Sequence, residues 1–165
     1  DNKARFAKDE ALDARMRQRF GAILQAAAAG ELWAWRSTAH GRLAEVIVLD
    51  QFSRNIHRGD ALAFANDALA LGLAQEAVAA GADRLLAPAE RAFLYMPYMH
   101  SESAAIHALA VALFSQPGLE HNLDFELRHK AIIDRFGRYP HRNAVLGRAS
   151  TAEEAAFLQT PGSSF

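Results

Sequence analysis

The stretch Gly41–Asn55, GRLAEVIVLDQFSRN, decides the fold class, because its centre is compatible with either a strand or a helix. Val46–Leu49 is a short apolar run rich in β-branched residues, which is typical of a buried strand. However, the apolar stretch continues for about a dozen residues, and Asp50 and Arg54 stand at the spacing of neighbours on one helix face. We therefore predict a buried helix, and pairing of Val46–Leu49 in a sheet would overturn this fold class.

The segments on either side also carry apolar residues at three- and four-residue steps, the period of one helix face. The clearest is Asp60–Ala80, capped by Asp60 and stopped by Gly81, with a stripe that includes Leu62 and Leu69. Capping residues, prolines and glycines mark where the other helices begin and end. The remaining predicted helices are Asp9–Ala29 capped by Asp9, a helix from Pro88 that Pro97 breaks, a helix from Ser101 or Ser103 to Gln116, Leu119–Phe136 stopped by Gly137, and a short helix after the capping box Thr151-x-x-Glu154.

These elements predict an all-α fold of about six or seven antiparallel helices, arranged as an α-superhelix or a compact helical array. Short turns join the helices and no linker divides the chain, so residues 1–165 are predicted to form a single helical domain. We expect more than about 60% helix and no sheet of three or more strands.

The composition excludes several kinds of protein and site. Of the 165 residues, 51% are hydrophobic and 22% are charged, an ordinary globular balance. The absence of cysteine excludes disulfides, thiolate zinc sites and cysteine nucleophiles. The formal net charge of −1 gives no reason to expect nucleic acid, and no apolar run reaches the roughly 18 residues of a membrane span. We expect a cytoplasmic protein that binds neither nucleic acid nor membrane.

No motif in the chain indicates a metal or a cofactor. Glu126-x-x-His129 has the spacing of one half of a di-iron carboxylate site, but such a site needs a second copy of the motif. The chain also lacks a phosphate-binding loop and a His-Glu-x-x-His motif. We therefore predict neither a metal nor a cofactor.

Asp50 lies within the most apolar stretch of the chain, where a carboxylate needs a partner. Arg54 follows it by four residues, which predicts a buried or half-buried ion pair. One interpretation is a purely structural clamp, and the other is that Asp50 orients His100. Arg54, Asn55 and Arg58 end the predicted helix beside a turn, and we expect them, together with Asp50, to bind a ligand.

The segment His100-Ser-Glu102 follows the predicted helix break, so we expect it at a helix start, where backbone N–H groups favour an anion. His100 can serve there as a general base, with Glu102 or Asp50 as the orienting carboxylate. The alternative is that Ser101 caps the helix and Glu102 only complements the helix dipole.

A basic segment follows near the C-terminus of an otherwise neutral chain. Glycine and proline turn its backbone sharply, so its guanidinium groups can converge on a carboxylate or a phosphate. The alternatives are a solvated basic turn, arginines bound to helix C-terminal carbonyls and, for the histidine in the helix, a hydrogen-bonded core position. We expect His100 and the arginines of residues 135–143 to meet across one pocket. The predicted ligand-binding residues of this segment are His129, Arg135, Arg138, His141, Arg142, Asn143 and Arg148.

Several long motifs, spread over essentially the whole chain, resemble those of one bacterial family. They are Leu49-Asp-Gln-Phe-Ser-Arg-Asn-Ile-His-Arg-Gly59, Ala63-Phe-Ala-Asn-Asp67, Phe93-Leu-Tyr-Met-Pro97, His100-Ser-Glu102, Arg128-His129, Arg135-Phe-Gly-Arg-Tyr-Pro-His-Arg-Asn143, Leu146-Gly-Arg148 and Gly162-Ser-Ser-Phe165. The sequence is thereby identified as a member of the bacterial domain-of-unknown-function family nine-twenty-four. The resemblance implies a tetratricopeptide-like α-superhelix and supplies no activity.

The chain departs from the family pattern at a few positions. Ser53 and His57 stand where the family usually has proline and tyrosine, and residues 103–109 lack its acidic and Gln-Glu-Arg positions. This weakens any mechanism that needs a glutamine or an arginine on that helix. The family usually begins upstream with an aromatic-rich segment, so we expect the N-terminal segment of the family to be absent here.

These observations leave two functions of different classes, besides a purely structural role. The first is a helical binding protein whose His- and Arg-lined groove holds an anionic small molecule or an acidic peptide. The second is an enzyme of hydrolase type, in which His100 is the general base, Glu102 or Asp50 orients it, and arginines hold an anionic substrate. A shifted histidine pKa in a deep pocket would favour the enzyme, and a long open groove would favour the binding protein.

Overall fold

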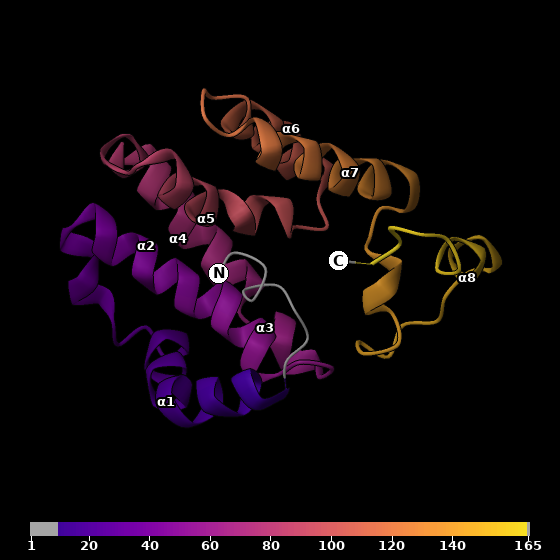
Figure 1. The fold of residues 1–165 in the computed structure, drawn as a ribbon, viewed down its shortest axis with the longest axis horizontal. Coiled ribbons are helices and arrows are strands. Elements are labelled where there is room, and N and C mark those ends of the chain that lie inside the picture. The colour runs from indigo at the N-terminus through magenta and orange to yellow at the C-terminus, as the bar shows by residue number, and fades with distance from the viewer. Residues whose placement is uncertain (1–9, 165) are drawn as a thin grey trace.

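Helices dominate the structure. The computed structural model describes residues 10–164, of which 72% lie in helices of some kind and none in a strand (Figure 1). Val46–Leu49 is therefore helical, and the all-α prediction is confirmed. Within this range no helix is long and apolar enough to cross a membrane. The α-helices are α1 (Glu10–Ala28), α2 (Ala39–Ile47), α3 (Ser53–Ile56), α4 (Asp67–Ala79), α5 (Pro88–Met99), α6 (Ala104–Phe114), α7 (Glu120–Phe136) and α8 (Ala152–Phe157). The shorter helical turns are η1 (Trp33–Ser37), η2 (Val48–Phe52), η3 (Ala61–Phe64), η4 (Ala82–Leu85) and η5 (Pro140–Arg142).

The stretch that decides the fold forms one continuous helix with a π turn inside it. Thr38 caps its start, and its hydroxyl accepts a hydrogen bond from the Gly41 amide at 3.0 Å. The backbone stays helical through Val48 and Ser53, so α2 passes through the π turn η2 directly into α3. The sequence places this helix correctly but does not show the π turn, because one turn with longer-range hydrogen bonds leaves the apolar spacing almost unchanged.

Successive helices pack against one another around a common core. α5 contacts α2, α4 and α6, and α6 contacts α7, as the helices coloured from violet to orange show in Figure 1. Because short turns connect these contacting helices, the chain reverses direction from one to the next. α1 contacts η2 and α3 and encloses a second apolar cluster around Leu24, Val48 and Leu49. The tetratricopeptide-like arrangement stays a prediction.

The predicted helix Asp60–Ala80 is wrong in its first turns. Asp60 caps only the short turn η3, its carboxylate accepting a hydrogen bond from the Leu62 amide at 2.8 Å. The α-helix α4 begins at Asp67 and ends before Gly81, whose φ of +69° is a left-handed conformation that suits glycine. The cap at Asp60 was therefore recognised correctly but assigned to the wrong element. Asp9, predicted to cap the first helix, lies outside the described residues.

The buried face of α4 also differs from the predicted leucine stripe. Leu62 and Leu69 are 52% and 36% exposed, whereas Ala70, Ala74 and Ala77 are completely buried. α4 contacts both α2 and α5. Close approach of helix backbones leaves room only for small side chains, so alanines occupy the centre of the contact, while Leu73 and Val78 of the predicted stripe pack partly buried beside them.

α5 continues past the proline that was predicted to break it. Pro97 lies inside this helix, which runs to Met99, and the His100 amide still donates to the Met96 carbonyl at 3.0 Å. The next helix, α6, starts only at Ala104. The expectation that His100 opens a helix is therefore wrong, because a proline in the last turn removes one backbone hydrogen bond without preventing the turn from closing. His100 caps a helix C-terminus, where carbonyl groups are left to bind side chains.

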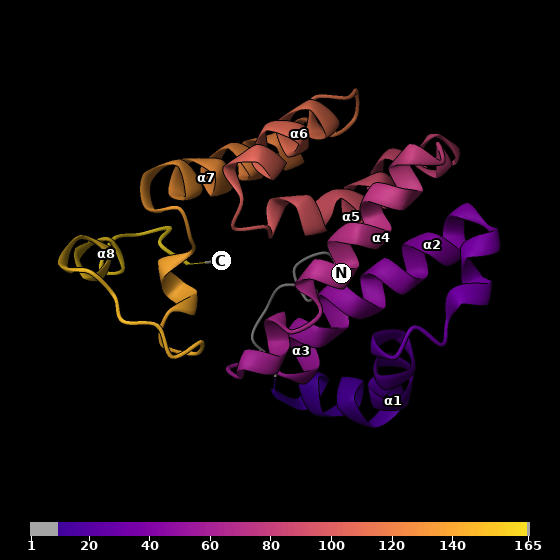
Figure 2. The ribbon, with the colours of Figure 1, turned by 180° about the vertical axis from the view of Figure 1, so that it is seen from behind.

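The chain after α7 returns toward the middle of the molecule. Gly137 ends α7 with a φ of +69°, and residues 138–164, which we call the C-terminal segment, contain η5 and α8 (Figure 2). Tyr139 is buried against α7 and anchors the start of this segment. From there Arg142 reaches Asp67 at the start of α4, at 3.2 Å between Nη1 and Oδ2. Two distant parts of the chain thus meet beside the end of α5.

Candidate functional site

Asp50 lies at the centre of the candidate site, within the π turn. Such turns reorient side chains along a helix and occur often at functional sites. The Asp50 side chain is 1% exposed, and its Oδ1 lies 2.7 Å from His100 Nδ1 and 3.0 Å from Arg54 Nη1. The side-chain amide of Gln51 donates to the other carboxylate oxygen. The predicted pair of Asp50 and Arg54 is therefore present, and His100 completes it.

The surroundings set the protonation states of Asp50 and His100. Burial alone would raise the pKa of Asp50, but its contacts with His100 and with the Arg54 cation hold it well below its ordinary value. Burial, and next the charge of Arg54, lower the pKa of His100, although Asp50 acts in the opposite direction. At neutral pH the pair is therefore an ionised carboxylate beside an uncharged imidazole. Because an ionised carboxylate only accepts, Nδ1 of His100 must bear the hydrogen.

Asp67 links two arginines from distant parts of the chain. Arg54 binds it with both terminal nitrogens, at 2.9 Å between Nη1 and Oδ1 and 3.1 Å between Nη2 and Oδ2. Arg142 donates to the same carboxylate at 3.2 Å. The series Asp50, Arg54, Asp67 and Arg142 thus alternates in charge, so the protein itself offsets the repulsion between the two guanidinium groups.

Arg142 is held rigidly between two aromatic rings. The central guanidinium carbon lies 4.6 Å from the ring centroids of both Phe64 and Tyr139. Nη2 donates to the His100 carbonyl at 3.0 Å, while Nε is buried and has no hydrogen-bond partner among residues 10–164. Burial lowers the pKa of Arg142, with Asp67 acting in the opposite direction. The rings therefore fix the guanidinium plane next to His100.

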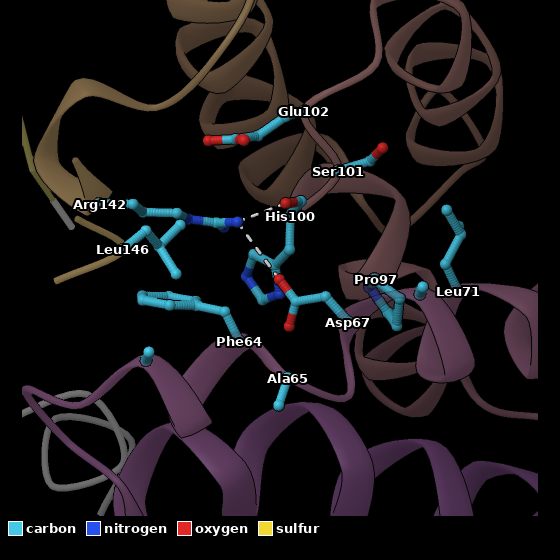
Figure 3. Close-up of a pocket in the computed structure, with 12 residues that line it drawn as sticks. Phe64, Ala65, Asp67, Leu71, Pro97, His100, Ser101, Glu102, Arg142 and Leu146 are labelled. Atoms are coloured by element: carbon cyan, nitrogen blue, oxygen red, sulfur yellow. Dashed lines mark hydrogen bonds and ion pairs between the residues drawn. The ribbon is translucent and has the colours of Figure 1, made fainter. Parts of the chain in front are cut away.

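His100 and Arg142 line the same pocket, which has a volume of about 410 Å³ and falls within the range of small-molecule sites. Figure 3 shows Arg142 reaching between Glu102 and Phe64 toward His100. The apolar lining consists of Ala61, Phe64, Ala65, Ala68, Leu71, Pro97 and Leu146, and the polar lining of Asp67, His100, Ser101, Glu102 and Arg142. A few polar groups thus meet at one end of a largely apolar pocket.

The second ring nitrogen of His100 is available to a molecule in this pocket. The side chain is 11% exposed, and Nε2 makes no hydrogen bond with any residue in the described range 10–164. Since Nδ1 bears the hydrogen, Nε2 has a free lone pair. An imidazole held by a buried carboxylate, with its other nitrogen facing a pocket, is the arrangement of a general base.

Known proteins that resemble the chain identify its family. A family model described as "Bacterial protein of unknown function (DUF924)" matches residues 1–162. The chain belongs to this family. It is also similar to a solved structure of a protein of unknown function from Agrobacterium tumefaciens, at 40% identity and a TM-score of 0.88, over 93% of this chain and 87% of that chain. No curated protein matches it.

Two predicted ligand-binding residues of this DUF924 chain contact α1 instead of the pocket. Asn55 Nδ2 and Arg58 Nη2 both donate to Asp13 Oδ1, at 3.1 and 3.0 Å. Neither residue lines the pocket beside His100. Asp13 is itself buried, so it needs these partners, and the structure does not bring Asn55 and Arg58 together with His100.

Most of the basic segment serves α8 rather than the pocket. Arg135 donates to Glu153 at 2.9 Å, and Arg138 binds Glu154 through two hydrogen bonds of 2.6 and 2.8 Å. The prediction that the arginines of residues 135–143 meet His100 is therefore right for Arg142 and wrong for the other two. Glu153 and Glu154 lie in the first turn of α8, where the helix dipole favours carboxylates, and these carboxylates bind the two arginines. Asn143, also predicted to bind ligand, is buried against Glu154 at 3.3 Å.

Glu102 does not orient His100, although it lines the pocket. Its carboxylate binds Arg148 through two hydrogen bonds of 2.6 and 2.9 Å and accepts the Tyr139 amide at 2.8 Å. Burial would raise the pKa of Glu102, but the bond to Arg148 holds it below its ordinary value. Of the two carboxylates considered from the sequence, Asp50 is the one that contacts the imidazole.

His129 and His141 lie around Tyr139, outside the pocket lining. Their ring centroids are 5.8 and 5.5 Å from that of Tyr139, and His129 Nδ1 lies 2.8 Å from the Phe125 carbonyl. Burial lowers the pKa of His129 to about 3 and that of His141 to about 4. In the described chain, no group of three or more His, Asp or Glu side chains is placed to hold a metal ion.

Sequence reasoning did not assign Asp67, Phe64 or Tyr139 to the site. Asp67 is the first residue of α4, a position where a carboxylate is expected for the helix dipole alone. Phe64 and Tyr139 look like ordinary core residues until Arg142 is placed between them. The available signal was charge balance, because Arg54 and Arg142 needed a second acidic partner besides Asp50.

Proposed function

We propose that this chain is an enzyme of hydrolase type, with His100 as its general base. The observation that supports this best is the buried Asp50–His100 pair, whose Nε2 faces a pocket of about 410 Å³. A histidine with a lowered pKa inside a pocket favours an enzyme over an open binding groove. Asp50 acts as the positioning carboxylate, since it fixes the imidazole with its hydrogen on Nδ1.

Arg142 is the group that holds an anionic part of the substrate. Each terminal guanidinium nitrogen bears two N–H groups, and each donates one of them to the protein, to Asp67 and to the His100 carbonyl. The remaining N–H groups can bind a carboxylate or a phosphate in the pocket. Phe64, Leu71 and Leu146 line the same space and suit an apolar part of the molecule.

The proposed reaction is general-base hydrolysis. Nε2 of His100 takes a proton from water while the water oxygen bonds to the carbonyl carbon or phosphorus of the substrate. The bond to the leaving group then breaks, and the proton passes from Nε2 to that group, which regenerates the neutral imidazole. Asp50 stays ionised throughout and stabilises the imidazolium that forms in between.

Binding of an anionic small molecule without turnover is the second candidate. The observation in its favour is the rigid placement of Arg142 between Phe64 and Tyr139, which suits an anchor for a ligand. The pocket volume fits a small molecule better than a peptide.

A substrate screen tests the proposal. We would measure hydrolysis of 4-nitrophenyl esters and phosphates that carry a short carboxylate chain, with the wild type, His100→Gln and Asp50→Asn. We expect a loss of at least about 100-fold in His100→Gln, because a positioned general base contributes that much or more. Asn at position 50 would donate to Nδ1 and place the hydrogen on Nε2, so Asp50→Asn should also be nearly inactive.

The pH profile and a control variant complete the test. Activity requires unprotonated His100, so it should fall as the pH drops through a midpoint below the ordinary value of 6.5. Arg135→Ala, which removes an exposed ion pair, should keep full activity. If no probe is hydrolysed but one raises the melting temperature of the wild type and not of Arg142→Ala, the binding function replaces the hydrolase.

A further inference from the structure

A second histidine–carboxylate pair lies behind the first, completely buried. His107 on α6 and Glu126 on α7 are both 0% exposed, with 2.7 Å between Nδ1 and Oε1. The other ring nitrogen of His107, Nε2, lies 2.8 Å from the Ser101 carbonyl. A carbonyl can only accept, so Nε2 must bear a hydrogen whichever way the proton is shared with Glu126.

Tyr139 and Arg142 act on the same short piece of backbone. The Tyr139 hydroxyl donates to the Met99 carbonyl at 2.6 Å, and Arg142 donates to the His100 carbonyl. With His107 on Ser101, three consecutive carbonyls are each held by a side chain from another part of the fold. These carbonyls lie at the end of α5 and just after it, where no helical amide follows to bind them.

We propose that His107, Glu126 and Tyr139 are positioning residues for His100. They fix the backbone on both sides of His100 and thereby keep its imidazole against Asp50, with Nε2 toward the pocket. The inference rests on the proposed role of His100 but concerns different residues, none of which lines the pocket. Burying so many polar groups is unfavourable unless each is bonded, so a network aimed at three adjacent carbonyls selects one conformation of that segment.

A merely structural role makes a different prediction. If the network only completed the end of α5, its loss would reduce stability and leave His100 unchanged. If it positions His100, a small displacement of the ring reduces the rate at a given substrate affinity, since a misplacement of about 1 Å can lower the rate about 100-fold. The two roles therefore separate in the titration of His100 and in the division between kcat and KM.

Tyr139→Phe and His107→Leu are the test variants, and Tyr95→Phe is the matched control. Tyr95 also has a buried hydroxyl, which donates to Asp83 at 2.7 Å on a different side of α5 from the pocket residues. It should therefore lower stability about as much as Tyr139→Phe without touching the segment at His100. His107→Gln, which keeps a donor for the Ser101 carbonyl, is the rescue variant.

The first measurement is NMR of the His100 imidazole, which needs no substrate. We expect the downfield Nδ1–H resonance to weaken, and the pKa of His100 to move toward its ordinary value, in Tyr139→Phe and His107→Leu. Tyr95→Phe should match the wild type, and His107→Gln should restore the wild-type behaviour in part. Unchanged His100 spectra in both test variants would overturn the inference, and this outcome does not depend on whether any substrate is hydrolysed.

The second measurement is steady-state kinetics on the probe ester or phosphate hydrolysed by the wild type. We expect kcat to fall about 10-fold in Tyr139→Phe and more in His107→Leu, with KM changed less than about 2-fold. Should His107→Leu not fold, Tyr139→Phe and His107→Gln still decide between the two roles. A change in KM alone would contradict positioning, because it would place the network in substrate binding.

Discussion

Among residues 10–164, two histidine–carboxylate pairs have a buried carboxylate and the same 2.7 Å separation, Asp50–His100 and Glu126–His107. They differ in what the second ring nitrogen does. Nε2 of His107 is bonded to a backbone carbonyl in the interior, whereas Nε2 of His100 faces a pocket. The same kind of pair therefore suits either a fixed structural link or, as we propose for His100, a base, according to whether one ring nitrogen is left accessible.

The carboxylates differ as well. Asp50 is also bonded to Arg54 and Gln51, so its pKa is held low despite burial. Glu126 has His107 alone, its Oε2 has no hydrogen-bond partner in the described chain, and burial raises its pKa. The Arg54 cation thus helps to keep the carboxylate of the first pair ionised, which is what an orienting group for a base requires.

The largest expected difference between the pairs concerns stability. Asp50→Ala should lower the free energy of unfolding by about 3 kcal/mol, because the largely buried Arg54 and His100 both lose the carboxylate that they share. A urea melt at pH 7 measures it, with Arg135→Ala as the reference. A loss below about 0.5 kcal/mol would show that Asp50 is solvated and that the first pair is not the buried one described.

The next largest effect is a loss of stability at acid pH, which we expect from protonation of the buried His129. The pKa of His129 is about 3 in the folded chain and near 6.5 when unfolded, so the unfolded chain takes up the proton first. Stability is therefore complete above 6.5 and is lost as the pH falls, by about 2 kcal/mol between pH 7 and pH 5 from this residue. Carboxylates with lowered pKa values lose their contribution only at lower pH.

Melts at pH 7 and pH 5 on the wild type and His129→Gln check this effect. The variant should lose less stability than the wild type over that interval, since it lacks the titrating ring. Equal losses in both proteins would mean that His129 is protonated in the folded state.

A smaller effect on stability is expected when the carboxylate of each pair is replaced by the corresponding amide. Glu126→Gln keeps an oxygen for His107 and removes a charge that burial already disfavours, so we expect a loss below about 1 kcal/mol. Asp50→Asn should cost more, because it removes the charge that Arg54 and His100 both use. Denaturant melts of the two variants give the order, and the reverse order would contradict the contrast drawn between the pairs.

The smallest expected effect lies outside both pairs. Arg135 and Glu153 form an ion pair whose side chains are 53% and 63% exposed, and such surface pairs contribute little. Arg135→Ala should change the free energy of unfolding by less than about 0.5 kcal/mol. A larger loss would show that the contact between Arg135 and α8 contributes to stability independently of the two histidine–carboxylate pairs.

What the sequence predicted well depends on short-range spacing. The four-residue step from Asp50 to Arg54 and the capping box of Thr151 and Glu154 are both present, because neighbours along one helix determine them. The helix over Val46–Leu49 belongs to the same class. The family was also predicted correctly, because family membership depends on the identity and order of residues and not on contacts in the fold.

What the sequence left unpredicted depends on contacts between distant segments. The sequence around His107 does not indicate that Glu126 is its partner, and the sequence around Arg142 does not indicate Asp67. Arg138 was expected at the pocket, yet Glu154 binds it, because whichever carboxylate the fold brings closest takes the cation. Of the residues predicted for the site, the structure brings Asp50, Arg54, His100 and Arg142 together, whereas Asn55, Arg135 and Arg138 bind partners elsewhere.

The separation in sequence between Asp67 and Arg142 determines the order in which the parts of the pocket can form during synthesis. The two residues are 75 positions apart, whereas Asp50 and His100 are 50 apart. During synthesis from the N-terminus, helices α1–α5 can pack and bring Asp50 to His100 before the C-terminal segment exists. Arg142, which lies in the C-terminal segment, is synthesised after these helices. If His100 and Arg142 have the roles proposed above, a newly made chain would hold His100 in place before it has the arginine that retains an anionic molecule, so binding of such a molecule would require the C-terminal segment.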